Sequence, residues 1–155
     1  DRGAAVTPRP ANNADAGWVL ALIQRVFAEH DGRVDPPSSM HQMRLEDVEQ
    51  QAENHEIWVI GKEACVFLTA QENGLYVGKL AVAPEARGKG RARALITQAE
   101  NRARALHLPQ LALQTRVELV ENHTAFQALG FVKTDESAHP GFDRATSFRF
   151  TKVLV

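Results

Sequence analysis

The sequence predicts an α/β domain built on a mixed sheet, and three features of its pattern lead to that prediction. Near the start, Val19, Leu22 and Val26 recur at the spacing of one helix face. Short apolar runs joined by tight turns follow, as in an antiparallel meander of strands. Helical and strand-like stretches then alternate to the end of the chain, so both kinds of element must share one core.

Each element has its own local signal, in chain order. A short strand is expected at residues 6–9 and a helix at 14–30, ended by Asp31-Gly32, while serines at 38 and 39 can cap a second helix to about residue 53. Strands at 57–60, 64–70 and 75–82 are separated by tight turns, and a glycine-rich loop at 84–90 leads into a strong helix to residue 106. A strand at 110–114, a helix at 122–129, a strand from 131, a turn at 139–141 and a strand at 145–154 complete the domain.

The composition is that of a single globular domain over residues 1–155. Hydrophobic residues make up 44% of the 155 and charged residues 24%, and no repeat or long linker divides the chain. At this length one core buries roughly 70% of the surface of the unfolded chain. Intrinsic disorder and a collagen-like or disulfide-stapled scaffold are therefore excluded.

Charge and hydropathy indicate where the protein works. The 18 Lys and Arg balance 19 Asp and Glu to a formal net charge of -1, which gives no overall attraction for nucleic acid or an anionic membrane. The longest apolar stretch, residues 18–23, is far shorter than the roughly 20 residues that cross a bilayer, and no signal segment precedes it. The only cysteine, Cys65, lies in an apolar run and is expected to be a buried thiol. We expect a soluble, cytoplasmic protein that binds neither nucleic acid nor membranes.

The most informative segment runs from Leu80 to Arg93, from a strand through a loop into a helix. Gly88 and Gly90 allow a tight turn that brings backbone N–H groups to a ligand, and the helix beginning near Gly90 adds the positive end of its dipole. Cations stand at alternate positions along it: Arg87, Lys89, Arg91 and Arg93. This construction predicts a pyrophosphate site.

Other phosphate-binding designs fit less well. The P-loop pattern G-x-x-x-x-G-K-[ST] does not occur, and a dinucleotide fingerprint needs glycine or alanine where Arg93 stands. A merely flexible basic turn remains as the plain alternative. It does not account for the strand-to-helix context or for the alternation of cations with glycines.

Two motifs resemble those of the GNAT superfamily of N-acetyltransferases. Arg87-Gly88-Lys89-Gly90-Arg91-Ala92 matches the R/Q-x-x-G-x-G/A signature of its acetyl-CoA-binding element. Residues 121–131 are similar to its late N-x-x-A…LGF segment, at a fitting distance downstream. The order of the elements also resembles the family's fold, so the similarity covers nearly the whole chain.

The resemblance implies a GNAT-like sheet, mixed but mostly antiparallel, flanked by helices and splayed at the cofactor site, between residues 75–82 and 110–114. It implies acetyl-CoA as the cosubstrate, whose pantetheine arm is held by the backbone of the strand and whose pyrophosphate is held by the loop. The implied cofactor-binding residues are Leu80, Ala81, Val82, Arg87, Gly88, Lys89, Gly90, Arg91, Ala92, Asn122 and Phe126. No metal is expected, because the histidines lack ligand spacing and there is one cysteine.

The implied reaction is direct attack on the thioester by a primary amine of a small molecule or a peptide. A backbone N–H near Leu80 or Ala81 would hold the oxyanion. Many relatives carry a tyrosine, as general acid, four residues before the glycine of LGF, but Phe126 stands there in this chain. Tyr76, the only tyrosine, is then a candidate acid, and water, Asn122 or His123 are possible substitutes.

Candidates for the base and for acceptor binding are weaker. His139, with Asp143, lies at the last hairpin turn, which borders the acceptor pocket in similar proteins; the alternative is a plain turn with a surface charge. Glu118 and Glu121 are either ligands for a cationic amine or solvated carboxylates.

Two questions stay open at the level of sequence. Phe126 leaves room for a non-catalytic acyl-CoA-binding regulatory module, and a homodimer is an alternative to a monomer.

Overall fold

The computed structural model describes residues 7–155. In chain order it contains β1 (Arg9–Pro10), α2 (Ala16–Ala28), α3 (Leu45–Asn54), β2 (Glu56–Ile60), β3 (Ala64–Gln71), β4 (Gly74–Val82), α4 (Arg91–Ala105), β5 (Gln110–Arg116), α5 (Val120–Ala128), β6 (Val132–Ser137) and β7 (Ser147–Val153). Short 3-10 turns lie at Asn13–Asp15, Ser39–Gln42 and Pro84–Ala86. The predicted α/β class and order of elements are confirmed.

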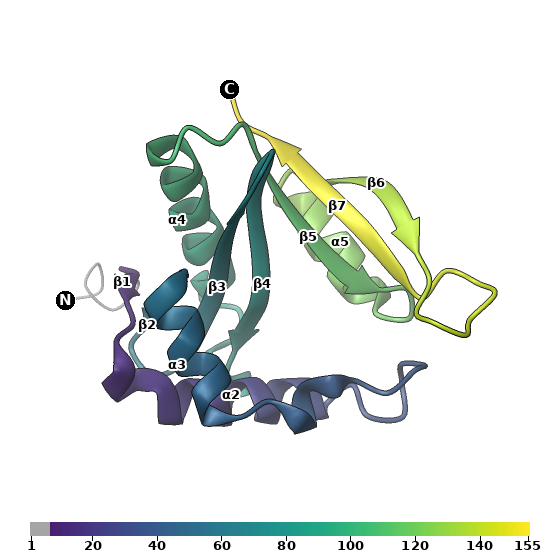
Figure 1. Ribbon diagram of the computed structural model, residues 1–155, viewed down its shortest axis with the longest axis horizontal. Helices are drawn as coiled ribbons and strands as arrows, with labels where there is room; N and C mark the ends of the chain where they lie inside the picture. Colours follow the sequence, from purple (N-terminus) through teal and green to yellow (C-terminus); the bar gives the residue numbers. More distant parts are fainter. Residues whose placement is uncertain (1–6) are drawn as a thin grey trace.

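The strands form one seven-stranded sheet in the order β1-β2-β3-β4-β5-β7-β6. All neighbouring strands run antiparallel except β4 and β5, which are parallel. That parallel pair has only two matched positions, Leu75 with Leu111 and Tyr76 with Ala112. Beyond them the two halves of the sheet diverge toward α2, which crosses below their open end (Figure 1). The predicted splay between these strands is confirmed.

Two hydrophobic clusters cover opposite faces of the sheet. Leu95, Ile96 and Ala99 of α4 pack with Leu75 and Val77 of β4 on one face. The side chains of α2 and α3 pack on the other face, against the remaining apolar positions of β2, β3 and β4. Neighbouring residues of a strand belong in turn to one cluster and then to the other, because successive side chains point to opposite faces of the sheet. The half of the sheet formed by β2, β3 and β4 is therefore covered on both faces.

Several element boundaries differ from the prediction for local reasons. The first strand is Arg9–Pro10, and residue 6 of the predicted strand lies outside the described residues. Ser38 caps the 3-10 turn at Ser39–Gln42 by accepting from the N–H of Met40, whereas α3 begins only at Leu45. The last strand begins at Ser147, two residues later than predicted, although the N–H of Thr146 still donates to the carbonyl of Ser137 at the end of β6.

Candidate functional site

The edge of β4 that faces the splay is open from Val77 to Val82. Strand β3 pairs with the other edge of β4, and β5 reaches β4 only at Leu75 and Tyr76. The residues predicted to bind a pantetheine arm, Leu80, Ala81 and Val82, lie in this open section. An extended ligand can therefore add to the sheet here as a further strand.

A β-bulge interrupts β4 within this section. Opposite Val66 of β3, two residues of β4, Lys79 and Leu80, lie between the partners Gly78 and Ala81. Lys79 has φ 50°, a left-handed conformation that side chains other than glycine rarely adopt. A bulge takes backbone groups out of the ladder and re-aims them, so it is suited to bind a ligand.

The loop after β4 presents unpaired backbone N–H groups. Those of Ala86 and Arg87 are bonded to Ala83 and Pro84, and the first carbonyl bond of α4 joins the N–H of Ala94 to Gly90 at 3.0 Å. Between them, the N–H groups of residues 88–93 find no acceptor within the described residues. This row of donors at a helix N-terminus is an anion-binding arrangement.

The glycines of the loop are required by its backbone. Gly88 and Gly90 have φ values of 77° and 81°, and Gly90 is the N-cap residue of α4. A Cβ atom added at either position would meet nothing within 4 Å, so the loop borders open space.

The four cations of the loop divide into two kinds. Arg87 pairs with Glu29 at 2.7 Å and Arg91 with Glu63 at 2.9 Å, and the Arg91 side chain is only 12% exposed. The side chains of Lys89 and Arg93 are exposed and have no hydrogen bond or ion pair in the described chain. The ion-paired arginines hold the loop to its neighbours, whereas Lys89 and Arg93 are free for an anion.

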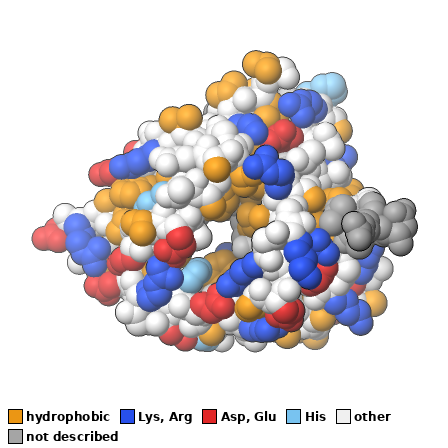
Figure 2. Space-filling view, turned by 180° about the vertical axis from the view of Figure 1, so that it is seen from behind, with side chains coloured by type: hydrophobic (Ala, Val, Ile, Leu, Met, Phe, Trp, Pro, Cys, Tyr) orange, Lys and Arg blue, Asp and Glu red, His pale blue; other side chains and the backbone are white. Residues whose placement is uncertain are grey.

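An opening lies near the centre of the molecule, where the two halves of the sheet diverge (Figure 2). Ion pairs join the α2–α3 connection to the start of α5 and to the β6–β7 connection. Arg33 pairs with Glu121 at 2.6 Å, and Arg144 pairs with Asp35 at 2.9 Å. The predicted acceptor loops are thus brought together at the mouth of the splay, on the side of α2.

Tyr76 lies where the splay begins. It is the last residue of β4 matched to β5, opposite Ala112. Burial raises its pKa above the ordinary value of a phenol, although Arg149 and the backbone of Gln114 act in the opposite direction. The side chain is therefore a neutral hydroxyl at physiological pH and can donate a proton.

His139 lies among the acceptor loops. Its Nδ1 contacts Thr146 Oγ1, and its Nε2 lies 3.4 Å from Nη1 of Arg116. Because a guanidinium only donates, Nε2 is the acceptor and the ring proton lies on Nδ1. Asp143, the neighbouring candidate, is in the same loop and is exposed at its tip.

The residues predicted on the late helix lie against β5 and β7. Asn122 is in the first turn of α5 and is not the N-cap, which is Leu119; its Nδ2 lies 3.4 Å from Thr115 Oγ1 on β5. Phe126 is half-buried against Phe131 and Phe150. His123 Nε2 lies 3.0 Å from the carbonyl oxygen of Arg116, which ties this ring to the end of β5.

Two functional candidates were missed from the sequence. Lys79, in the bulge, makes no side-chain hydrogen bond or ion pair within residues 7–155, and burial lowers its pKa. Arg116, at the end of β5, has two buried nitrogen atoms without partners. The bulge at Lys79 could have been found from the sequence. The apolar positions that face α4 change from the odd-numbered Leu75 and Val77 to the even-numbered Leu80 and Val82, and such a change requires an extra residue between them.

Residues 7–155 contain no group of three or more His, Cys, Asp or Glu side chains placed to hold a metal ion. None of their helices combines the length and apolar character needed to span a membrane.

The sequence itself defines the class of protein. Residues 53–133, just over half of the chain, match the family model of the acetyltransferase (GNAT) domain. The chain therefore belongs to the GNAT acetyltransferase family, and the predicted resemblance is confirmed. None of the curated proteins matches the sequence.

Solved structures share the fold at low sequence identity. A GNAT-family acetyltransferase from Staphylococcus aureus Mu50 aligns with a TM-score of 0.76 and 13% identity over 96% of this chain and 99% of that one. A spermidine N-acetyltransferase SpeG chimera from Vibrio cholerae and hSSAT gives 0.72 and 18%, over 95% and 94%. The PaiA N-acetyltransferase from Thermoplasma acidophilum, in complex with coenzyme A, gives 0.75 and 13%, over 95% and 98%. At these identities the likeness establishes the fold.

Proposed function

We propose that the protein is an N-acetyltransferase that moves an acetyl group from acetyl-CoA to a primary amine of a small molecule or peptide. The observation that carries the proposal is the open edge of β4, which leads directly into the unpaired N–H groups of residues 88–93. A long ligand with an amide-containing arm and a pyrophosphate matches that sequence of binding groups. The likeness to a protein solved in complex with coenzyme A supports the same cosubstrate.

The proposed cofactor contacts follow the geometry. The backbone of Leu80, Ala81 and Val82 would pair with the pantetheine arm, and the amides of residues 88–93 would bind the pyrophosphate. Lys89 would reach the outer phosphates. Arg87 and Arg91 would act mainly by holding the loop, since each already has a carboxylate partner. Asn122 and Phe126 would contact the arm from α5.

In the proposed reaction a neutral amine attacks the thioester carbonyl. A nitrogen–carbon bond forms, the carbon–sulfur bond breaks, the amine's proton passes to a base or to water, and the CoA thiolate leaves and is protonated. The bulge offers backbone groups near Leu80 to hold the oxyanion. Holding both reactants in line in the splay supplies a large part of the acceleration.

Tyr76 and His139 are the proposed catalytic groups. Tyr76 would protonate the leaving sulfur, and its position at the start of the splay and its raised pKa support this role. His139 lies on the acceptor side, but its Nε2 accepts from Arg116, so it must release that bond before it can act as a base. Thiol release measured across amines tests catalysis directly.

A non-catalytic acyl-CoA-binding regulatory module is the alternative, and Phe126 is the observation in its favour. The ring packs against Phe131 and Phe150 and has no proton to donate. Acetyl-CoA binding without thiol release, over a panel of polyamines, antibiotics, amino acids and peptides, would support this module. Turnover with any one of these amines excludes it.

The loop assignment is tested by Gly90→Asp, which puts a side chain and a negative charge beside the proposed pyrophosphate. We expect acetyl-CoA affinity, measured by calorimetry, to fall at least ~100-fold, from lost anion binding and charge repulsion. Gly32→Asp is the matched control, because Gly32 has φ 78° and equally open space but lies outside the loop. Equal affinities of the two variants would contradict the assignment.

Location and assembly belong to the same proposal. A cytoplasmic site of action is supported by the single, buried cysteine, Cys65. A homodimer is kept as the alternative to a monomer, and sedimentation of the purified protein separates the two.

A further inference from the structure

The guanidinium of Arg116 is buried with one edge unpaired. Its Nε and Nη2 atoms are covered and have no hydrogen-bond partner, whereas Nη1 lies 3.4 Å from Nε2 of His139. Burying charged donors without partners costs free energy. Its backbone is nevertheless fixed as the last residue of β5, and its Nη1 contacts His139 of the β6–β7 connection.

The unpaired edge is the one that binds a carboxylate with two parallel hydrogen bonds. Elsewhere in this chain, Arg102 uses its Nε and Nη2 to bind the two oxygens of Glu56, each at 2.8 Å. A guanidinium and a carboxylate match in this planar geometry, which makes such pairs specific as well as strong. Arg116 therefore offers the same binding edge to a group that the chain itself does not supply.

A buried acceptor without a partner lies two residues further along the chain, on Glu118. Glu118 Oε2 accepts from the backbone N–H of Asp35 at 3.1 Å, but Oε1 is buried and has no partner. Arg116 and Glu118 do not pair with each other. One ligand that carries both an anion and an amine would satisfy both groups.

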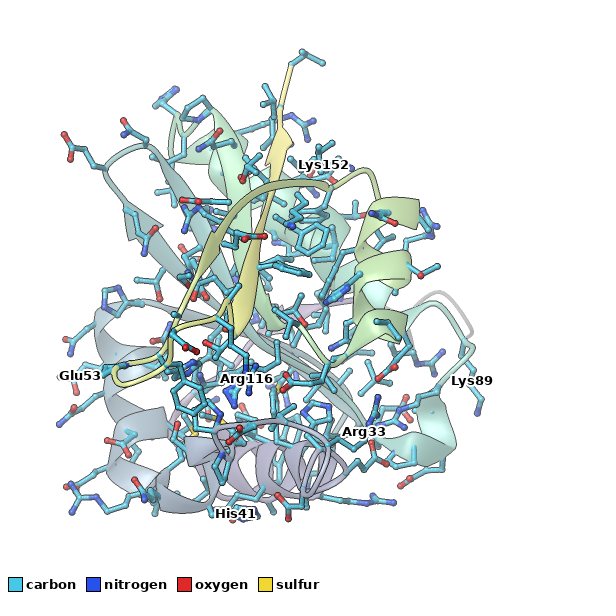
Figure 3. All side chains as sticks on the ribbon, turned by 90° about the vertical axis from the view of Figure 1, so that its right-hand side faces the viewer. Arg33, His41, Glu53, Lys89, Arg116 and Lys152 are labelled. Atoms are coloured by element: carbon cyan, nitrogen blue, oxygen red, sulfur yellow. The ribbon has the colours of Figure 1, made fainter. Side chains whose placement is uncertain are left out.

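The pair lies where the acceptor is expected. Figure 3 shows Arg116 between the sheet and helix α2, with Arg33 on the same side, whereas Lys89 projects from the loop at the edge of the view. The ion pairs that close these connections, Arg33 with Glu121 and Arg144 with Asp35, have half-exposed side chains. Exposed pairs contribute little free energy, so the loops can part to admit a ligand.

We propose that the acceptor is an amine that also carries a carboxylate, of the size of a free amino acid. Arg116 binds the carboxylate through Nε and Nη2, and Glu118 Oε1 accepts from the amine. His139, held by Thr146, positions the guanidinium edge toward the ligand while the ligand binds, and it becomes available as the proposed base only after it releases Arg116. The inference rests on the proposed function and narrows its substrate: a polyamine lacks the anion, and a peptide N-terminus lacks a nearby carboxylate.

The experiment compares matched ligands on protein saturated with CoA. Binding of the twenty free amino acids, of their carboxamides and of the corresponding aminophosphonates is measured by calorimetry, and acetylation by thiol release from acetyl-CoA. We expect at least one amino acid to bind ~100-fold more tightly than its carboxamide, since the amide lacks the negative charge and presents a donor NH2 in place of one of the two acceptor oxygens. Tighter binding of the aminophosphonate overturns the choice of a carboxylate.

Variants assign the effect to Arg116. Arg116→Gln should remove the preference for the acid over the amide, and Arg116→Lys should restore only part of it, because lysine lacks the two-donor edge. His139→Gln should weaken binding of the acid more than that of the amide. Arg104→Gln, which removes an exposed cation on α4, is the control and should keep the full preference. Unchanged acetyl-CoA affinity in each variant shows that the fold and the cofactor site are intact.

The outcomes separate this inference from the proposed function. Amino-acid binding without acetylation supports the inference and contradicts catalysis. Acetylation of amines with no preference for acids over amides supports catalysis and overturns the inference. A wild-type protein that binds no amino acid, or a preference that survives Arg116→Gln, also overturns it.

Discussion

One oxygen of the Glu63 carboxylate accepts from two nitrogens of Arg91, Nε at 3.2 Å and Nη2 at 2.9 Å. The remaining Nη1 of Arg91 donates to the carbonyl of Lys89 at 3.1 Å. The guanidinium therefore ties the turn between β2 and β3 to the loop that precedes α4. A cation that the sequence suggests for phosphate binding instead fixes the shape of the loop, and the exposed Lys89 is left for the ligand.

Arg91 and Lys89 should consequently differ on substitution. Arg91→Gln is expected to lower the free energy of unfolding by about 1–2 kcal/mol, since it removes a largely buried ion pair. Lys89→Gln should change stability by less than about 0.5 kcal/mol and weaken acetyl-CoA binding, more at low salt than at high salt. Urea unfolding and calorimetry at two salt concentrations measure both quantities. Equal losses of stability in the two variants would contradict this division of roles.

Asp15 should make stability depend on acidity. Its carboxylate accepts from Arg9 at 2.9 and 3.0 Å, from Trp18 Nε1 at 2.8 Å and from the Asn12 N–H at 3.0 Å. These hydrogen bonds, of which the one from Arg9 has the largest effect, hold the pKa of Asp15 well below the ordinary value of an aspartate. A carboxyl whose pKa is lower in the folded state stabilises the protein above its unfolded pKa, near 4, and loses this contribution as the pH falls further.

The variant Asp15→Asn is therefore expected to cost about 2–3 kcal/mol at pH 7. The difference from wild type should shrink as the pH falls below about 4, in urea titrations at several pH values. Arg9→Gln is the control and should cost less, because Trp18 and Asn12 still donate to Asp15 and because the Arg9 side chain is 46% exposed. A difference that does not vary with pH would show that the carboxylate charge contributes nothing.

Cys65 should be chemically silent in the folded protein. It is fully buried, and burial raises its pKa to about 12, although a backbone hydrogen bond from Ala81 acts in the opposite direction. Because the thiolate is the reactive form, iodoacetamide should label Cys65 only after unfolding. Cys65→Ala should retain acetyl-CoA binding at a cost of about 1 kcal/mol in stability. Rapid labelling of the native protein, read by mass, would contradict the burial of this thiol.

The backbone geometry of the proposed cofactor side could be predicted because its signals are local. The strand, the two glycines and the following helix are contiguous from Leu80 to Arg93, and the proposed contacts are made by the backbone groups of these residues. Helix and strand periodicity likewise placed the elements to within a few residues. The exception, the late start of α3 at Leu45, arises where capping by Ser38 closes only a 3-10 turn.

The acceptor side could not be predicted, because it is assembled from distant segments. Arg116 has no motif around it, and its importance depends on His139, which contacts it from the β6–β7 connection, and on its neighbour Glu118, which Asp35 contacts from the α2–α3 connection. Which two of the four loop cations are already paired is also invisible in the sequence, because Glu29 and Glu63 lie far along the chain from the loop that they hold. Tertiary contacts decide both points.

Tyr76 should act in the chemical step and not in cofactor binding. Tyr76→Phe keeps the ring and its packing but removes the hydroxyl, so we expect kcat to fall roughly 10²-fold, as for loss of a general acid. Acetyl-CoA affinity should stay within about twofold, because the proposed contacts of the cofactor in β4 are made by backbone groups. Because burial raises the pKa of Tyr76, its ionisation should not limit the rate of the wild type below about pH 10. An unchanged kcat for Tyr76→Phe, with the amine that the wild type acetylates, would make this side chain a packing group and leave protonation of the thiolate to water.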